Sequence, residues 1–184
     1  FVTDHGLSTM LPSDGLVSNL QRGPTPATPS YTITRKYINI VKATAGANAD
    51  SAFASYDDNE TTDWVNDGQL ATAWIEYELE RPATISEVEM KLNNFRSRSY
   101  PIRITVDGKE VFNDSTKKSL GYFTAVCKPT LGKKIRIELT KESIGNNNNG
   151  VEVAGKKLDD GVARDDSKAK GTLSIIEVEM YEKL

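Results

Sequence analysis

The sequence has one histidine and one cysteine, and this scarcity limits the chemistry that the chain can perform. His5 lies far in sequence from any candidate nucleophile, and Cys127 stands in an apolar stretch typical of a small core residue. A single cysteine excludes an internal disulfide. The sequence also has no serine nucleophile motif, phosphate-binding glycine loop or histidine metal cluster. We therefore expect no catalytic site, and no enzyme activity, in these 184 residues.

An excess of one charge sign and long apolar runs are missing as well. The 23 basic and 26 acidic residues are interspersed and leave a formal net charge of -3. Nucleic-acid binding needs basic residues clustered on one face, so we expect no nucleic-acid partner. No apolar run approaches the ~18 residues of a membrane span, and the start of the chain does not resemble a signal peptide. Because the chain opens on Phe1 rather than Met, we expect it to be a piece of a longer polypeptide.

Residues 1–37 differ from the remainder of the chain. The stretch Gly23-Pro-Thr-Pro-Ala-Thr-Pro29 fixes φ at three prolines and removes three backbone donors. Such a stretch is typical of a semi-rigid spacer. Several apolar residues before it favour packing on a neighbouring domain over a free tail. We assign residues 1–37 to a linker or the end of a preceding domain, and residues 38–184 to one domain.

Alternation of apolar and polar residues dominates from Ile38 onward and predicts short β-strands. The predicted strands cover residues 75–79, 88–92, 102–106, 135–139 and 176–180. Pro82 is expected to end the first of them. Asp107-Gly108 supplies the positive φ of a tight hairpin, with Val111-Phe112 on the returning strand. One buried and one wet face per strand is typical of antiparallel sheets, so we predict an all-β sandwich or jelly roll.

A long segment, Ser143 to Gly171, interrupts this rhythm. It is rich in Asn, Asp, Gly and Lys, and loops of this length are functional or mobile. The composition favours mobility over at least part of the segment.

The stretch Phe53–Trp64 crowds carboxylate, amide and hydroxyl oxygens into a short loop. Asp57, Asn59 and Thr62 offer oxygens at the short spacing that suits a hard cation such as Ca²⁺. The alternative is a turn in which Asp57 and Asn59 accept hydrogen bonds from their own backbone. A distant carboxylate would favour the cation, because one loop rarely completes the coordination shell, and Glu177 is the candidate.

A second candidate site is the inter-strand stretch Asn93–Tyr100. Sugar binding needs planar hydrogen-bonding groups and an aromatic face, which Arg96, Arg98, Asn93 and Tyr100 could provide. The alternative is a polar loop with Tyr100 buried before a proline, and for Tyr100 itself this is the favoured interpretation. Asn66 and Asp67 are expected beside the same rim. Trp64 and Trp74 are expected in the core.

Five stretches in order resemble the discoidin, or coagulation-factor type C, domain family, whose bacterial relatives include carbohydrate-binding module family 32. They are Asp57–Trp64, Trp74–Leu79, Ile85–Val88, Tyr100–Gly108 and Ser174–Tyr181, and the resemblance covers roughly residues 38–182. It implies an eight-stranded, antiparallel jelly-roll sandwich of the galactose-binding-domain type. It also implies a structural calcium and a ligand site in loops at one end.

Carried over by position, the resemblance assigns the calcium ligands to Asp57, Asn59 and Thr62, with the carbonyl of Ala54 and the carboxylate of Glu177. The family often has Asp-Gly-Asp where this chain has Asp57-Asp58-Asn59. Arg96 falls near the family's frequent sugar-contacting arginine. The family's common loop histidine is replaced here by Val65-Asn66.

A second resemblance involves Leu7–Pro12, Asn19–Tyr31 and the ending Gly171–Glu179. These stretches look like the C-terminal region of bacterial family 2 glycoside hydrolases of the β-galactosidase type. The resemblance implies an accessory module of an extracellular or periplasmic enzyme, with glycan, a galactose-type sugar included, and the catalytic domains of the parent chain as partners. The alternative function is a purely structural domain that braces the parent enzyme and binds no ligand.

Overall fold

The computed structural model describes residues 33–94, 98–117, 121–145, 151–153, 156–158 and 170–184. All the described elements belong to one compact unit, Thr34–Leu184. The described residues of this unit form twelve strands and two short 3₁₀ helices: β1 (Arg35–Ile38), β2 (Ile40–Ala45), η1 (Ala49–Ser55), β3 (Trp64–Val65), η2 (Leu70–Thr72), β4 (Trp74–Leu92), β5 (Arg98–Ser99), β6 (Pro101–Val106), β7 (Lys109–Ser115), β8 (Phe123–Leu139), β9 (Ile144–Gly145), β10 (Val151–Val153), β11 (Lys156–Leu158) and β12 (Ser174–Lys183).

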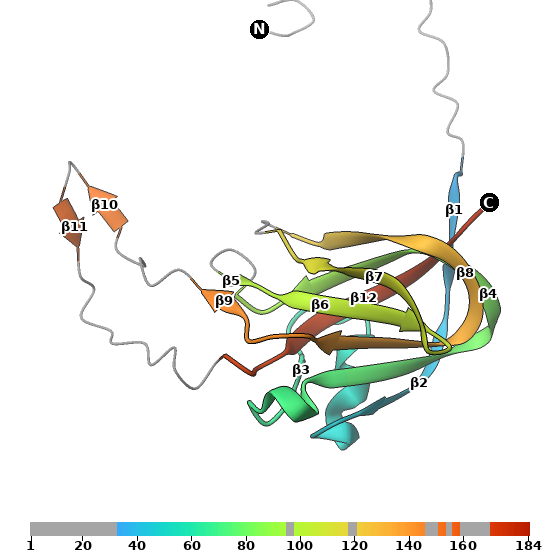
Figure 1. Cartoon of the computed structure of the whole chain (residues 1–184), viewed down its shortest axis with the longest axis horizontal. Helices are drawn as coiled ribbons and strands as arrows, with labels where there is room; N and C mark the ends of the chain where they lie inside the picture. The colour runs from blue at the N-terminus through green and yellow to red at the C-terminus, as the bar shows by residue number, and fades with distance from the viewer. Residues whose placement is uncertain (1–32, 95–97, 118–120, 146–150, 154–155, 159–169) are drawn as a thin grey trace, which may run out of the picture. The chain divides into compact units, whose positions relative to one another are not determined.

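The strands form a two-layer sandwich in which every pairing is antiparallel (Figure 1). The strand order is β1-β12-β4-β8-β6-β7, with β2 also on β4 and β3 also on β12. The first half of β4 lies between β2 and the second half of β8. The second half of β4 lies between β12 and the first half of β8. Because β4 and β8 run through both layers, they join the two sheets. The predicted antiparallel jelly-roll sandwich is confirmed.

The core is built by the alternating residues that predicted the strands. Ile75, Tyr77 and Leu79 are fully buried on β4, and their neighbours on the strand are more exposed. Fully buried Ile137 and Ile135 of β8 are paired with Ile75 and Tyr77 in the same sheet and lie beside them. Burial of each such aliphatic side chain contributes about 1.5–3 kcal/mol to folding.

The prediction that Pro82 ends the strand is wrong, because β4 continues from Trp74 to Leu92. The pairing with β8 breaks between Glu78 and Ala83, where β4 passes from one layer to the other. Proline lacks a backbone donor and is tolerated where the ladder of hydrogen bonds is interrupted. The proline therefore marks the bend between the layers.

The predicted hairpin at Asp107-Gly108 is present between β6 and β7. Asp107 has a φ of 46° and Gly108 a φ of 80°, as a two-residue turn of this hand requires. The carboxylate of Asp107 also accepts a hydrogen bond from the Lys134 backbone N–H at 2.9 Å. The turn is thereby tied to β8.

The compact unit begins at Thr34, before the boundary predicted at Ile38. Strand β1 contains Arg35–Tyr37, which the sequence assigned to the linker, and it pairs with β12. Only Ile38 of its four residues is buried, so the strand carries no alternating signal.

The segment from Ser143 to Gly171 is described only in part. Its two ends meet, because the Ser143 backbone N–H donates to the Lys170 carbonyl at 2.8 Å. Within it, β9 pairs with β5, and β10 pairs with β11. The predicted mobility of this segment concerns residues that lie largely outside those described. In the described part of the chain, no helix has the length and apolar character needed to cross a membrane.

Candidate functional site

The loop after η1 carries the predicted cation ligands and has a defined local structure. The Asn59 backbone N–H donates to Oδ1 of Asp57 at 3.1 Å, and the Thr62 hydroxyl lies 3.0 Å from Oδ2 of Asp57. The Thr61 backbone N–H donates to the side-chain oxygen of Asn59 at 3.1 Å. The turn contacts that the sequence offered as the alternative to a cation are therefore formed.

Glu177 of β12 lies beside this loop and is buried, although it is a carboxylate. Its Oε2 atom has no hydrogen-bond partner within the described residues. Burial raises the pKa of Glu177, and the negative charge of Asp57 raises it further, while backbone N–H groups of Val178, Asn59 and Asp58 oppose the shift. The fold thus brings together the two carboxylates that the sequence paired.

These residues fit a calcium ion by their donor chemistry. A buried, unpartnered carboxylate oxygen is costly unless a positive charge compensates it. The two carboxylates, the Asn59 amide, the Thr62 hydroxyl and the carbonyl of buried Ala54 are all oxygen donors, which Ca²⁺ prefers. Within the described ranges no group of three or more His, Cys, Asp or Glu side chains could hold a metal, so a calcium ion here would depend on neutral oxygens as well.

Asp58 shows how the loop keeps its shape without the family's glycine. Its φ is 58°, in the left-handed region that glycine adopts most readily. Aspartate and asparagine are the non-glycine residues that visit this region most often. The substitution therefore preserves the turn between Asp57 and Asn59.

Asn66, predicted on the ligand rim, is buried and holds two loops together. Its amide nitrogen donates to the carbonyls of Gln69 at 2.9 Å and Gly171 at 3.0 Å, and its oxygen accepts from the Leu173 backbone N–H at 2.9 Å. A Cβ at Gly171 would lie 2.4 Å from the carbonyl oxygen of Gly68, so these loops touch backbone to backbone. The side chain of Asn66 therefore bonds within the fold and holds these two loops together.

Asp67 remains exposed at the same edge. Its Oδ1 atom accepts a hydrogen bond from the Gln69 backbone N–H at 3.1 Å and another from the Thr72 hydroxyl. Both hydrogen bonds lower the pKa of Asp67, and the one from Thr72 has the larger effect. The carboxylate is ionised at neutral pH and accessible to a ligand.

Asn93 and Tyr100 are turned inward. The amide nitrogen of Asn93 donates to Asp63 Oδ2 at 2.6 Å and to the Ser174 hydroxyl at 2.7 Å. The Tyr100 hydroxyl donates to the Asn93 carbonyl at 2.5 Å, and burial raises the pKa of Tyr100 to about 12. Buried at this place, Tyr100 presents no face to a sugar, which agrees with the interpretation favoured for it from the sequence.

Of the two arginines in the predicted rim, Arg96 lies outside the described residues. Arg98 is buried on β5, where its guanidinium donates to the Ser143 hydroxyl at 2.7 Å. It therefore joins the 93–100 loop to the base of the long segment. Its burial and this contact fit a structural role better than a contact with an outside ligand.

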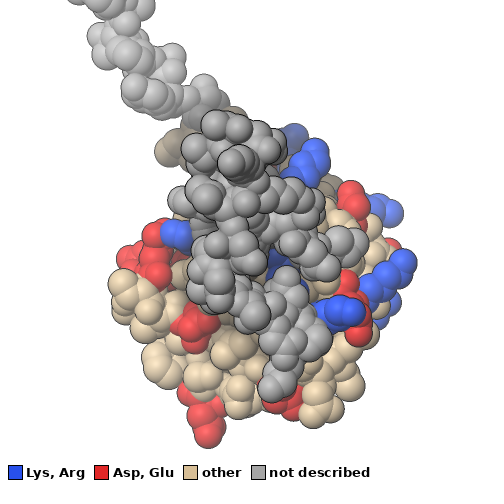
Figure 2. Space-filling view, turned by 90° about the vertical axis from the view of Figure 1, so that its left-hand side faces the viewer, with Lys and Arg blue, Asp and Glu red and all other residues tan. Residues whose placement is uncertain are grey.

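Figure 2 looks onto the side of the molecule that carries β5 and β9. Acidic and basic side chains both appear there, with the basic ones mainly on the right of the view and acidic ones on both sides and at the bottom. On the described surface of this face no broad field of one sign stands out.

The tryptophans differ from one another. Trp64 is fully buried, as predicted, and its indole nitrogen donates to the Ala47 carbonyl at 3.1 Å. Trp74 is only half-buried, and the Arg136 guanidinium lies 3.9 Å from the centre of its ring system. The prediction that Trp74 belongs to the core is wrong, because its position on β4 faces outward.

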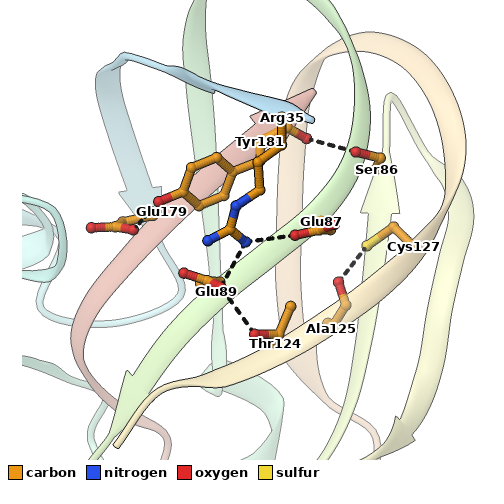
Figure 3. Close-up of polar contacts among 9 residues, drawn as sticks. All are labelled: Arg35, Ser86, Glu87, Glu89, Thr124, Ala125, Cys127, Glu179 and Tyr181. Atoms are coloured by element: carbon orange, nitrogen blue, oxygen red, sulfur yellow. Dashed lines mark hydrogen bonds and ion pairs between the residues drawn. The ribbon is translucent and has the colours of Figure 1, made fainter. Parts of the chain in front are cut away.

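The outer face of the other layer holds an ion-pair cluster around Arg35 (Figure 3). The guanidinium lies 2.6 Å from a Glu87 oxygen, 2.7 Å from a Glu89 oxygen and 4.1 Å from the centre of the Tyr181 ring. Both carboxylates accept hydrogen bonds from Arg35 and raise its pKa. The cluster pins β1 to the sandwich.

Cys127 is buried close to this cluster and its thiol points to the Ala125 carbonyl, 3.5 Å away (Figure 3). Burial raises the pKa of the thiol to about 12, and the charge of Glu87 acts in the same direction. The thiol is protonated at neutral pH and is a poor nucleophile. This agrees with the core role predicted for it.

The structure also contains a hollow that the sequence did not indicate. It measures about 480 Å³ and lies between the end of β7 and the start of β8. Its lining residues are Phe112, Asp114, Ser115, Lys117, Tyr122, Phe123, Thr124 and Val126. The adjacent aromatic residues Tyr122 and Phe123 are the one feature of the sequence that relates to this hollow. They do not indicate a hollow unless the position of β7 beside them is known.

The sequence pattern of the F5/8 type C domain family matches residues 39–153. The match spans more than half of the chain, and the chain belongs to this family. No curated protein sequence matches it.

Solved structures show the same fold at low sequence identity. A truncated AlyQ with CBM32 and alginate lyase domains gives a TM-score of 0.60 at 19% identity, over 83% of this chain and 34% of that one. The CBM32 of AlyQ in complex with 4,5-unsaturated mannuronic acid gives a TM-score of 0.57 at 20% identity, over 79% of this chain and 97% of that one. A pectin-binding carbohydrate-binding module gives a TM-score of 0.53 at 15% identity, over 78% of this chain and 91% of that one. This chain is therefore similar in fold to single carbohydrate-binding modules.

Proposed function

We propose that the chain is a non-catalytic carbohydrate-binding module. The observation that carries the proposal is the fold similarity to the CBM32 of AlyQ, of which 97% is covered by this chain. That relative was determined with an unsaturated mannuronic acid, and another structural neighbour is a pectin-binding module. Membership of the F5/8 type C family, together with the lack of a catalytic constellation in the sequence, supports the same function.

The contacts proposed at the loop end are Asp67 and Arg96. Asp67 is exposed and ionised, and Arg96 is assigned by its place in the family pattern. Asn66, Asn93, Arg98 and Tyr100 are assigned to the framework of these loops, because their polar groups bond within the fold. A galactose-type sugar is the first ligand to test.

We infer that a structural calcium ion binds at Asp57, Asn59, Thr62, the Ala54 carbonyl and Glu177. The buried Glu177 oxygen without a partner in the described residues supports this inference. A bound cation compensates the two neighbouring carboxylates and fixes the loop after η1 against β12. Asp57 and Glu177 supply the charge, while the other donors complete the oxygen shell.

The proposed parent is a secreted or periplasmic glycan-degrading enzyme of the β-galactosidase type. This proposal rests on the resemblance of residues 7–31 and on the AlyQ relative, in which a CBM32 is joined to an alginate lyase. The module would hold the parent's catalytic domains near their substrate. Simultaneous engagement of this kind raises the effective concentration of the substrate.

A glycan array probed with the labelled 184-residue chain in excess calcium tests this function. We expect retention on at least one glycan class, competed by the free sugar, and a loss of about fivefold or more in Arg96→Ala. Arg81→Ala, which removes an arginine paired with Glu182 elsewhere, is the matched control. Absence of binding to every galactoside, uronate and glycosaminoglycan on the array would contradict the proposal.

A structural brace is the second candidate function. The burial of Asn66, Arg98 and Tyr100 favours it, because those residues hold the fold and are not offered to a ligand. Deleting residues 34–184 from the parent would then lower its unfolding temperature without changing its binding to polysaccharide. A parent of unchanged stability that loses polysaccharide binding would exclude the brace.

A further inference from the structure

The hollow between β7 and β8 is built by two strand edges that belong to different layers. β7 pairs with β6, and the first half of β8 pairs with β4, and within the described residues neither strand has a second partner on the side facing the hollow. The two strands run side by side in Figure 1. The volume of about 480 Å³ falls within the range of small-molecule sites.

The lining combines aromatic rings with polar groups. Phe112 and Phe123 meet edge to face, with ring centroids 6.0 Å apart and planes at 67°. Both rings are half-buried, so each keeps surface toward solvent. Asp114 and Lys117 stand exposed at the same hollow and provide an acceptor and a donor. A pyranose ring needs this combination, since its C–H face packs on aromatic rings while its hydroxyls exchange hydrogen bonds.

The third aromatic ring is held in place from two sides. The Tyr122 hydroxyl donates to Glu60 Oε1 at 3.2 Å, and the Lys91 ammonium lies 5.8 Å from the centre of the Tyr122 ring and bonds to Glu60. Glu60 lies in the loop between Asn59 and Thr62. The hollow is thereby connected to the proposed calcium loop, and its wall is preorganised, which lowers the entropic cost of binding.

Further along β8, Thr124 lines the hollow and its hydroxyl donates to Glu89 at 3.0 Å, at the edge of the Arg35 cluster (Figure 3). The hollow therefore opens onto a polar surface rather than an apolar one. Among the described lining residues, the two exposed charges, on Asp114 and Lys117, have opposite signs. This balance favours a neutral sugar over a polyuronate, which would place repeated negative charge next to Asp114.

We propose that this hollow is a second glycan subsite, on the side of the sandwich, that takes a neutral oligosaccharide with one pyranose ring against Phe112 and Phe123. The proposal rests on the proposed function and adds to it a place and a ligand class. Asp67 is not among the residues that line this subsite.

The test is a ¹H–¹⁵N NMR titration of the 184-residue chain, in calcium, with lactose, cellobiose and digalacturonate. Lactose or cellobiose is expected to shift the backbone signals of residues 112–117 and 122–126. Lys117→Ala and Asp114→Asn should each weaken binding about fivefold, as the loss of one hydrogen bond to a sugar hydroxyl predicts. Lys109→Ala and Asp50→Asn, which make the same changes at exposed positions outside the hollow, should leave the affinity within twofold.

Other outcomes separate the two proposals. Neutral sugars that shift only signals around Asp67 and the 93–98 loop, with both hollow variants binding normally, would overturn the subsite and keep the module function. A digalacturonate affinity above that of the neutral sugars, lost in Lys117→Ala, would overturn the ligand class. No shift with any sugar, as expected if the strand edges receive an extended peptide instead, would overturn both.

Discussion

Replacing Glu177 by glutamine tests whether the buried carboxylate is there to hold a cation. Calcium bound at the proposed site, at 100 times its Kd, should stabilise the wild-type fold by about 2.7 kcal/mol. For a domain of this size each kcal/mol raises Tm by about 2–4 °C, so calcium should raise Tm by about 5–11 °C over chelator. Glu177→Gln removes one of the two carboxylates, and the difference between calcium and chelator should then fall below about 2 °C.

In chelator the order of stabilities should reverse. Without a cation, the wild type buries a Glu177 oxygen that has no partner among the described residues, which costs about 1–3 kcal/mol. The glutamine amide avoids that charge and can donate toward Asp57. We therefore expect Glu177→Gln in chelator to melt at or above the wild type, by differential scanning calorimetry.

The pH dependence of folding stability is an independent test of the role of Glu177. The folded-state pKa of Glu177 is raised above its ordinary value of 4.5, so its protonation favours the folded state. In chelator, the contribution of this group to stability is fully present below the ordinary pKa and is lost as pH rises through the folded value. Calcium should invert this trend, since protons compete for the same oxygen, and Glu177→Gln should remove both trends.

Glu142→Gln, at an exposed position, is the matched control and should behave as wild type in both buffers. Atomic emission on the chain dialysed in excess calcium should find one calcium for each wild-type chain and much less in Glu177→Gln. Equal melting of wild type and Glu177→Gln in both buffers, with the same metal content, would refute the reasoning.

Three further predictions follow from the fold. Asn66→Ala should destabilise the chain by about 2–3 kcal/mol in urea denaturation, because the Leu173 N–H and the Gly171 carbonyl lose a buried partner, and a loss under 0.5 kcal/mol would show that water replaces the amide. Gly108→Ala should cost about 1–2 kcal/mol because of its positive φ, whereas Gly121→Ala, at a glycine whose φ is not positive, should cost little; equal losses would contradict the turn. Cys127 should react with a disulfide reagent at pH 8 at least about 100-fold more slowly in the folded chain than in guanidinium, and equal rates would contradict its burial.

The strands were predictable because their signal is local. Ile75, Tyr77 and Leu79 alternate with polar residues whatever the remainder of the chain does, and Asp107-Gly108 marks a turn by its own backbone preferences. The passage of β4 through Pro82 was not predictable, because it depends on where β8 interrupts its pairing. The register of a strand, and the layer to which it belongs, depend on the strand it pairs with. The sequence of a single strand therefore does not determine them.

The site divides along the same line. The meeting of Asp57 with Glu177 could be inferred from the family pattern, since both positions carry that pattern's acidic residues. The inward orientation of Asn66 and Arg98 could not, because their residue types are usually found at surfaces, and only the packing of distant loops shows that they are buried. The hollow at Phe112 and Phe123 likewise exists only once two strand edges from different layers are side by side.

The most direct test of the central claim is affinity electrophoresis of the calcium-loaded 184-residue chain in native gels that contain galactan, pectin or alginate. A carbohydrate-binding module predicts slower migration in at least one polysaccharide gel than in a plain gel, reversed by the matching free oligosaccharide. Migration that is unchanged in every polysaccharide, from a chain shown to be folded and calcium-bound, would contradict the account.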